Sequence, residues 1–198
     1  MNAQPQKKTR MTPEEYLEFE RNSDIKHEYF AGDIFTMVGA RKNHILIGAN
    51  ITAELVSKFA AGNSTCRVLP NDMRVKIQND SGYAYPDISI ACGDIEFEDN
   101  NFDTLMNPII IIEILSKSTE AFDRGDKFAY YRLIPSLQEY ILVSQKRHRI
   151  ERFVRKDDGT WSMFLYEDIK QTMSMETIDC EVPLSVIYRW IEFDDADI

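Results

Sequence analysis

Two acidic residues, Asp87 and Glu113, point most clearly to chemistry. Glu113 interrupts an apolar run that begins at Ile109 and resumes at Ile114. A carboxylate in such a run must be paired, protonated or bound to a metal, because burial of an unpaired charge is costly. Asp87 precedes the alternating segment 88–92, which predicts a strand with one apolar face. Taken alone, Glu113 could equally lie at an exposed strand end or in a salt bridge.

An antiparallel hairpin would bring these two carboxylates together. If Cys92 pairs with Pro108, the same register pairs Asp87 with Glu113, and the acidic segment 93–107 becomes the connecting loop. Directly opposed side chains have Cβ atoms about 5 Å apart. Two carboxylates at that separation repel each other unless a cation or a proton lies between them. Oxygen ligands of this kind are typical of Mg²⁺ or Mn²⁺, which would keep water molecules for substrate and nucleophile.

A third component is expected on a following helix. Asp123, Lys127 and Tyr131 recur at intervals of four residues and would share one helix face. Most such triplets are an exposed salt bridge beside an aromatic ring. If this face instead packs over the end of the hairpin, Lys127 could reach the space beside the two carboxylates. Its ammonium would then orient an attacking water or neutralise charge in a phosphorane-like transition state.

The elements that must position these residues predict an α/β or α+β domain built on a mixed sheet flanked by helices. The chain of 198 residues fits a loose segment 1–10 and a single domain 11–198 with an acidic tail. Helices are expected after Thr12, over 41–61, over 119–133 and after Val182, with a hairpin over 26–35 and strands over 67–69, 73–77, 86–92, 108–115, 139–143, 149–155 and 161–166.

Charge restricts the class of function. The 23 basic and 33 acidic residues give a net charge of −10, which argues against a generic nucleic-acid binder. A net value does not exclude a local cationic groove. The segment 146–156 holds six basic residues and only one acid, Glu151. It could follow a phosphate backbone, although a strand with charge on its solvent side is the commoner explanation.

Cysteine use and hydropathy indicate a cytoplasmic protein without a membrane segment. Cys66, Cys92 and Cys180 form an odd set without close spacing, which predicts reduced thiols rather than disulfides or a zinc site. The longest apolar run, at 109–112, is far too short to cross a bilayer. No apolar stretch follows the basic residues near the start, so no signal peptide is expected.

The string Tyr85-Pro86-Asp87, followed by Glu113-Ile114-Leu115, resembles the signature of the PD-(D/E)XK nucleases, in which a proline–aspartate pair precedes an acid-x-lysine on an adjacent strand. More closely, the chain resembles the Uma-type family of bacterial proteins described as restriction endonucleases, from about residue 12 to residue 187. The stretches that carry this resemblance are 28–33, 113–119 and Asp123 through Lys127 to Tyr131, with His44, Glu139 and Tyr140 fitting the same pattern.

The resemblance implies a restriction-endonuclease-like fold and metal-dependent hydrolysis of phosphodiester bonds in DNA. Asp87 and Glu113 would be the ligands of Mg²⁺ or Mn²⁺. Leu115 stands where the superfamily has its motif lysine, and leucine cannot position a water. The Uma-type pattern favours Lys127 in that role, and Lys117, expected on the same strand face as Glu113, is a weaker candidate.

Further residues and partners follow from the same resemblance. Glu28 is either an additional acid of the site or, more commonly for such a position, a surface-turn residue. His44 is more typical of a histidine at the edge of the core than of a ligand. Many nucleases of this fold act as dimers, so a homodimer is expected.

Two alternatives remain at this point. Leu115 and the net charge of −10 favour a catalytically inactive nuclease-fold module that binds nucleic acid or protein. The acidic surface would also suit a hydrolase of smaller phosphate esters.

Overall fold

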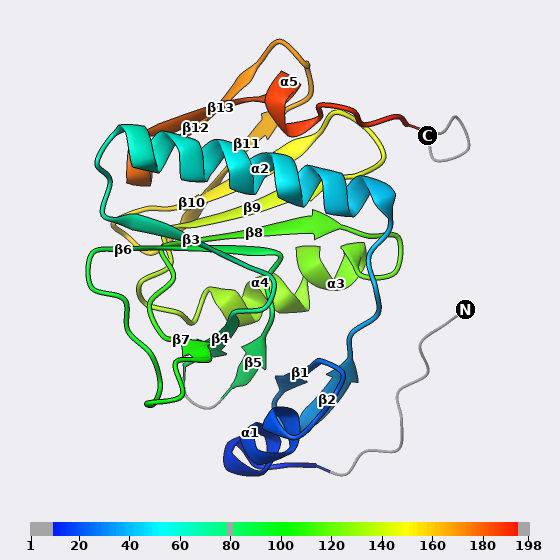
Figure 1. Cartoon of the computed structure of the whole chain (residues 1–198), viewed down its shortest axis with the longest axis vertical. Helices are drawn as coiled ribbons and strands as arrows, with labels where there is room; N and C mark the ends of the chain where they lie inside the picture. Colours follow the sequence, from blue (N-terminus) through cyan, green and yellow to red (C-terminus); the bar gives the residue numbers. More distant parts are fainter. Residues whose placement is uncertain (1–9, 79–80, 194–198) are drawn as a thin grey trace.

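A six-stranded mixed sheet runs through the middle of the molecule (Figure 1), in a computed structural model that describes residues 10–78 and 81–193. Its strand order is β11-β10-β9-β8-β6-β3. The central pair β8 and β9 is parallel, and the other neighbours are antiparallel. The strands are β3 (Cys66–Pro70), β6 (Ile88–Cys92), β8 (Ile110–Leu115), β9 (Glu139–Ser144), β10 (Ile150–Arg155) and β11 (Trp161–Tyr166).

A second, five-stranded sheet has the order β2-β1-β5-β4-β7 and lies with helix α1 toward the lower end of the molecule in Figure 1. A two-stranded ribbon and the short helix α5 follow the large sheet in the chain. These elements are α1 (Pro13–Arg21), β1 (His27–Phe30), β2 (Asp33–Thr36), β4 (Arg74–Ile77), β5 (Gly82–Ala84), β7 (Thr104–Leu105), β12 (Thr172–Met175), β13 (Cys180–Pro183) and α5 (Leu184–Ile187), with a 3₁₀ turn at Glu176–Ile178.

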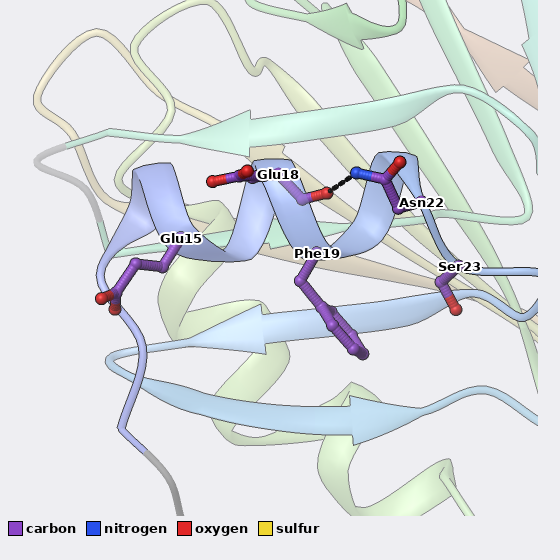
Figure 2. A pocket seen from close by; sticks show the side chains of 5 residues that line it. All are labelled: Glu15, Glu18, Phe19, Asn22 and Ser23. Carbon is purple, nitrogen blue, oxygen red and sulfur yellow. Dashed lines mark hydrogen bonds between the residues drawn. The ribbon is translucent and has the colours of Figure 1, made fainter.

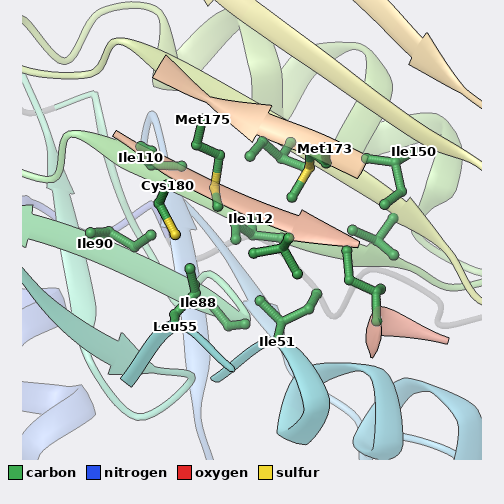
Figure 3. Packing of buried hydrophobic residues seen from close by; sticks show 14 of the residues in the cluster. Ile51, Leu55, Ile88, Ile90, Ile110, Ile112, Ile150, Met173, Met175 and Cys180 are labelled. Carbon is green, nitrogen blue, oxygen red and sulfur yellow. The ribbon is translucent and has the colours of Figure 1, made fainter. Parts of the chain in front are cut away.

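Helix α2 (Lys42–Ala61) covers one face of the large sheet. Its buried side chains Ile47, Ile51, Leu55 and Phe59 recur every fourth residue, so they form one apolar stripe along the helix. This stripe packs with the sheet, β12, β13 and α5 in the larger core (Figure 3).

The opposite face of the large sheet is covered by α3 (Glu120–Arg124), α4 (Asp126–Tyr131) and the smaller sheet. Strand β8 serves both cores because its side chains alternate. Ile110, Ile112 and Ile114 enter the core under α2, whereas Ile111 and Leu115 enter the core under α4. The alternation places Glu113 on the α4 side of the sheet.

The predicted register of the hairpin is confirmed. Ile88 pairs with Ile112 and Ile90 with Ile110 in antiparallel order, and one further step along this register places Asp87 opposite Glu113. The prediction that 93–107 is only a connecting loop is wrong. Residues 104–105 form β7, which pairs in parallel with β4 and extends the smaller sheet.

Most of the other predicted elements are present, with two kinds of exception. The single helix expected over 119–133 is wrong, because α3 and α4 are separated at Gly125. The short strands β5, β12 and β13 were not anticipated.

Among the described residues no helix is long and apolar enough to cross a membrane. The segment predicted to be loose lies, except for Arg10, outside the described residues, as do the last five residues of the acidic tail.

The prediction of three reduced cysteines is wrong for two of them. Cys66 on β3 and Cys92 on β6 face each other in the antiparallel pair, and a disulfide joins them. Cys180 is free and buried. The two bonded cysteines are 26 positions apart, and only the strand pairing brings them together.

Candidate active site

Glu113 lies under helix α4, where two side chains of that helix reach the same carboxylate oxygen. The ammonium of Lys127 lies 2.9 Å from Glu113 Oε1. The hydroxyl of Tyr131 donates a hydrogen bond of 2.9 Å to the same oxygen. Lys127 and Tyr131 are four residues apart, so both project from one helix face. All three side chains are buried, and the alternative of an exposed salt bridge is therefore wrong.

The break at Gly125 determines how Asp123 relates to this group. Gly125 has φ −107° and ψ −97°, outside the helical region, so α3 and α4 do not share one continuous helical register. Asp123 is nevertheless buried, and its Oδ1 lies 3.8 Å from Lys127 Nζ. Its backbone carbonyl accepts a hydrogen bond from Tyr140, which ties the end of α3 to β9.

Glu28 joins the group from the first hairpin. It is buried on β1, and its Oε1 lies 2.9 Å from Lys127 Nζ. The same oxygen accepts a hydrogen bond from the backbone N–H of Tyr85, two residues before Asp87. The expectation of a surface-turn glutamate is wrong, because the hairpin packs against α4 and directs this carboxylate inward.

Asp87 is held at both of its oxygens. The backbone N–H of Ile114 donates a 2.7 Å hydrogen bond to Oδ2, and His44 Nε2 lies 2.8 Å from Oδ1. His44 stands in the first turn of α2 and therefore contacts the site, although the sequence favoured a place at the edge of the core. The side chains of Asp87 and His44 retain 18% and 19% exposure, against 5% for Glu113. The site therefore opens to solvent on the side of Asp87 and His44.

Charge in this group is not balanced. Three carboxylates, those of Glu28, Glu113 and Asp123, surround the single ammonium of Lys127. Burial lowers the pKa of Lys127, but the three carboxylates outweigh burial and hold that pKa well above its usual value, so the ammonium stays charged. Burial raises the pKa of Glu113 to about 8, with Lys127 opposing and Asp87 adding to the effect. Burial also raises the pKa of Asp123.

The donor atoms fit a hard divalent cation held by two protein ligands. Within residues 10–78 and 81–193, no group of three or more His, Cys, Asp or Glu side chains is arranged to hold a metal ion. Mg²⁺ commonly takes one or two carboxylates and completes its shell with water and substrate phosphate. Asp87 and Glu113 provide oxygen ligands only, and a divalent cation would offset the surplus negative charge. The residues present therefore fit Mg²⁺ or Mn²⁺.

Neither Leu115 nor Lys117, the two positions considered for the motif lysine, places a positive charge in the site. Leu115 is buried in the apolar core under α4. Lys117 lies beyond the end of β8 and is exposed, so the prediction that it shares a strand face with Glu113 is wrong. Gln145, which the sequence did not single out, donates a hydrogen bond of 2.9 Å to the backbone carbonyl of Leu115.

The basic segment 146–156 is largely committed to partners within the protein. Arg152 forms a buried ion pair with Glu139 at 2.6 Å, and Arg149 lies 2.7 Å from Glu151. Arg155 donates hydrogen bonds to backbone carbonyls at the end of α4 and in the loop that follows. These three arginines stabilise the fold, and they are not available to follow a phosphate backbone.

A hollow of about 480 Å³ lies along the outer side of α1 and away from this group (Figure 2). Its lining residues are Glu15, Glu18, Phe19, Asn22 and Ser23. The lining has two carboxylates and no basic side chain, which does not suit an anionic substrate. None of the residues predicted for catalysis contributes to it.

A mixed central sheet flanked by helices, with buried acids and a lysine gathered at one strand end, is a restriction-endonuclease-like architecture. A family model described as "Uma2: Putative restriction endonuclease" matches residues 13–186. The chain belongs to this Uma2 family, and family membership supports a nuclease.

Two relatives come from Synechocystis sp. (strain ATCC 27184 / PCC 6803 / Kazusa). "Uncharacterized protein slr1290" is 35% identical over 184 residues, which cover 93% of this chain and 94% of the relative. "Uncharacterized protein sll1609" is 34% identical over 151 residues, which cover 76% and 84% of the two chains.

A solved structure has the same fold. A crystal structure from Anabaena variabilis ATCC 29413, described as "a putative nuclease belonging to DUF820", aligns with a TM-score of 0.75 and 15% sequence identity. The alignment covers 92% of this chain and 99% of that one. The predicted fold class is therefore confirmed.

Proposed function

We propose that this protein is a metal-dependent endonuclease of the PD-(D/E)XK type that hydrolyses phosphodiester bonds in DNA. The observation that carries the proposal is the surplus of carboxylates at the end of the β6–β8 hairpin where Asp87 and Glu113 lie. Among the described residues, Glu28, Glu113 and Asp123 are buried beside one ammonium, that of Lys127, and the partly exposed Asp87 lies next to them. Such an arrangement is costly for stability and is typical of sites that bind a cation and do chemistry.

Asp87 and Glu113 would hold Mg²⁺ or Mn²⁺ in this proposal. The bound ion would polarise the phosphoryl oxygens and lower the pKa of a water molecule. His44 and the backbone N–H of Ile114 orient Asp87, which keeps its side chain directed to the open side of the site. Tyr131 orients Glu113 from within.

Lys127 contributes positive charge rather than proton transfer. Its pKa is held well above the usual value by its carboxylate neighbours, so it does not serve as a base near neutral pH. Its ammonium holds the side chains of Glu113 and Glu28 in place. It would also stabilise the negative charge that develops on the phosphoryl group in the transition state. Hydrolysis adds the oxygen of one water to phosphorus and breaks the bond to the leaving oxygen, which gains a proton. The products are a phosphate monoester and an alcohol.

The test is cleavage of supercoiled plasmid DNA with Mg²⁺ or Mn²⁺ and with excess EDTA. We expect nicking or linearisation that requires the metal and is lost in Asp87→Ala and Glu113→Ala. Thermal unfolding of both variants checks that the fold is intact. The proposal is wrong if neither metal supports cleavage, or if the two variants cleave as fast as the unsubstituted protein.

The same assays separate the alternatives. Cleavage of short phosphodiesters without cleavage of polymeric DNA would indicate a hydrolase of smaller phosphate esters. Binding of DNA without metal-dependent cleavage would indicate an inactive module, which Leu115 at the motif position favours. The expected homodimer stays a prediction. Sedimentation velocity, which measures the oligomeric state in solution, would test it.

A further inference from the structure

We infer that duplex DNA docks on a basic rim around the opening of this site; this inference rests on the proposed function. The rim consists of five basic residues from three separate segments of the chain. Arg41 and Lys42 stand at the start of α2, Lys117 lies in the loop after β8, and Lys146 and Arg147 lie in the turn between β9 and β10.

Hydrogen bonds place these three segments side by side. The side-chain amide of Asn43, next to Lys42, donates to the backbone carbonyl of Gln145 at 3.4 Å. The side-chain amide of Gln145, next to Lys146, donates to the carbonyl of Leu115 at 2.9 Å. Figure 1 shows the same arrangement, with the start of α2, the tip of β8 and the β9–β10 turn at the right-hand end of the molecule.

The rim lies next to the side on which the site is open. His44 directly follows Asn43 in the first turn of α2 and contacts Asp87. Glu113 and Lys127 are nearly inaccessible, whereas Asp87 and His44 are partly exposed. A phosphate group that reaches the proposed ligands from the side of His44 therefore passes close to the rim.

The rim contains positive charge that the protein does not use internally. Arg41, Lys117 and Arg147 are exposed and have no ion-pair partner within residues 10–78 and 81–193. Lys42 and Lys146 have looser contacts, at 3.3 Å to Glu192 and 3.7 Å to Glu120. This separates the rim from Arg149, Arg152 and Arg155, whose guanidinium groups are all bonded within the fold.

The acidic residues responsible for part of the net charge lie at the other end of the large sheet. The segment 94–103 follows Cys92, and β6 runs from Asp87 at the site to Cys92 at the far end. Asp99 and Asp103 are paired with Arg21, and Glu98 with Lys76, whereas Asp94 and Glu96 have no ion-pair partner within residues 10–78 and 81–193. A polyanion is attracted at the rim and not at that end, so the field favours its approach to the site. A net charge of −10 is therefore compatible with a DNA substrate.

The experiment measures DNA binding apart from cleavage. Fluorescence anisotropy of a fluorescein-labelled DNA duplex is followed across a range of salt concentrations in the Asp87→Ala protein. Lys117→Gln and Arg147→Gln are each added to this background. Lys156→Gln is the matched control, because Lys156 is exposed at the opposite end of the sheet, after β10. Thermal unfolding confirms that each variant is folded.

We expect each rim variant to weaken binding and to reduce the salt slope by about 1. A variant that carries both Lys117→Gln and Arg147→Gln in the same background should reduce the slope by about 2. The control should leave the slope unchanged. The inference is overturned if the parent does not bind DNA, if Lys156→Gln reduces the slope as much as the rim variants, or if the rim variants bind unchanged. An RNA duplex that binds more tightly than DNA overturns the choice of DNA. Salt-dependent binding at the rim without cleavage by the unsubstituted protein supports the inference while the proposed function fails.

Discussion

The ammonium of Lys127 lies 2.9 Å from the carboxylate of Glu113, although one residue is on a helix and the other on the central strand of a sheet. In the PD-(D/E)XK pattern that the sequence resembles, a lysine two positions after the acid supplies this charge from the same strand. Here that position is Leu115, which is buried in the apolar core. The charge instead comes from α4, fourteen positions after Glu113 in the sequence. In the proposed active site, helix packing therefore positions the ammonium that strand alternation positions in that pattern.

Replacement of Lys127 by methionine tests this relationship. The variant removes the ammonium that the buried acidic side chains of Glu28, Glu113 and Asp123 face, and we expect it to lower the free energy of unfolding by about 3–5 kcal/mol. Cleavage should fall by about 10²-fold or more, because within the part of the chain that the structure describes no other ammonium lies in the group. Urea denaturation and the plasmid assay measure the two effects. Lys156→Met, at an exposed site, should change stability by less than about 0.5 kcal/mol. Equal effects of both substitutions would contradict the assigned role.

Glu113→Gln should stabilise the protein, and more so at higher pH. Burial raises the pKa of Glu113 from 4.5 to about 8 in the folded protein. The unfolded chain therefore releases this proton near pH 4.5, whereas the folded protein retains it up to about pH 8. Because the folded state binds more protons in that window, the free energy of unfolding falls as pH rises through it. Glutamine keeps the shape and removes the titration.

The measurement is thermal unfolding of both proteins between pH 5 and pH 8 in EDTA. The melting temperature of Glu113→Gln minus that of the unsubstituted protein should be close to zero at pH 5 and should increase steadily to pH 8. A difference that is constant, or that decreases with pH, would show that the carboxylate is not held protonated. Loss of cleavage together with gained stability would be the usual trade-off at an active site.

His44 should govern how well Asp87 binds a metal ion. Removal of a side chain that orients a ligand typically costs about 10–100-fold in metal affinity. We expect His44→Ala to weaken Mn²⁺ binding to that extent in isothermal titration calorimetry. His44→Gln should retain most of the affinity, since its amide can still donate to Asp87. If alanine and glutamine have the same effect, or if neither changes affinity, the 2.8 Å contact does not orient the ligand.

Much of the fold could be predicted because the sequence patterns that indicate its helices and strands are local. The buried stripe of α2 has the helical period, and the alternation of β6 and the isoleucines of β8 predicted both strands and their register. The two-residue strand β7 and the pairing of β12 with β13 depend on tertiary contacts, so they leave little trace in the sequence. The break at Gly125 was missed because the apolar and charged spacing continues across it.

The candidate site was only partly accessible to the same reasoning. Strand register and helix spacing sufficed to place Asp87, Glu113 and Lys127 at one end of the fold. The inward direction of Glu28 depends on how the hairpin packs against α4. The backbone N–H that holds Asp87 belongs to Ile114, and a main-chain donor has no identity that a sequence could reveal. The disulfide is a further example, since only strand pairing joins its two cysteines.

The contact between Glu28 and Lys127 has a consequence for how the protein can be shortened or cut. The first hairpin supplies one of the acids that keep the lysine charged, and the backbone next to Asp87 is bonded to that same acid. A proteolytic cut that releases the amino-terminal hairpin would leave both proposed ligands in the chain, and we expect it to abolish the proposed cleavage. The amino-terminal segment that carries the first hairpin, about a fifth of the polypeptide, would in this sense be part of the proposed active site, and fragments that begin at α2 should not cleave DNA.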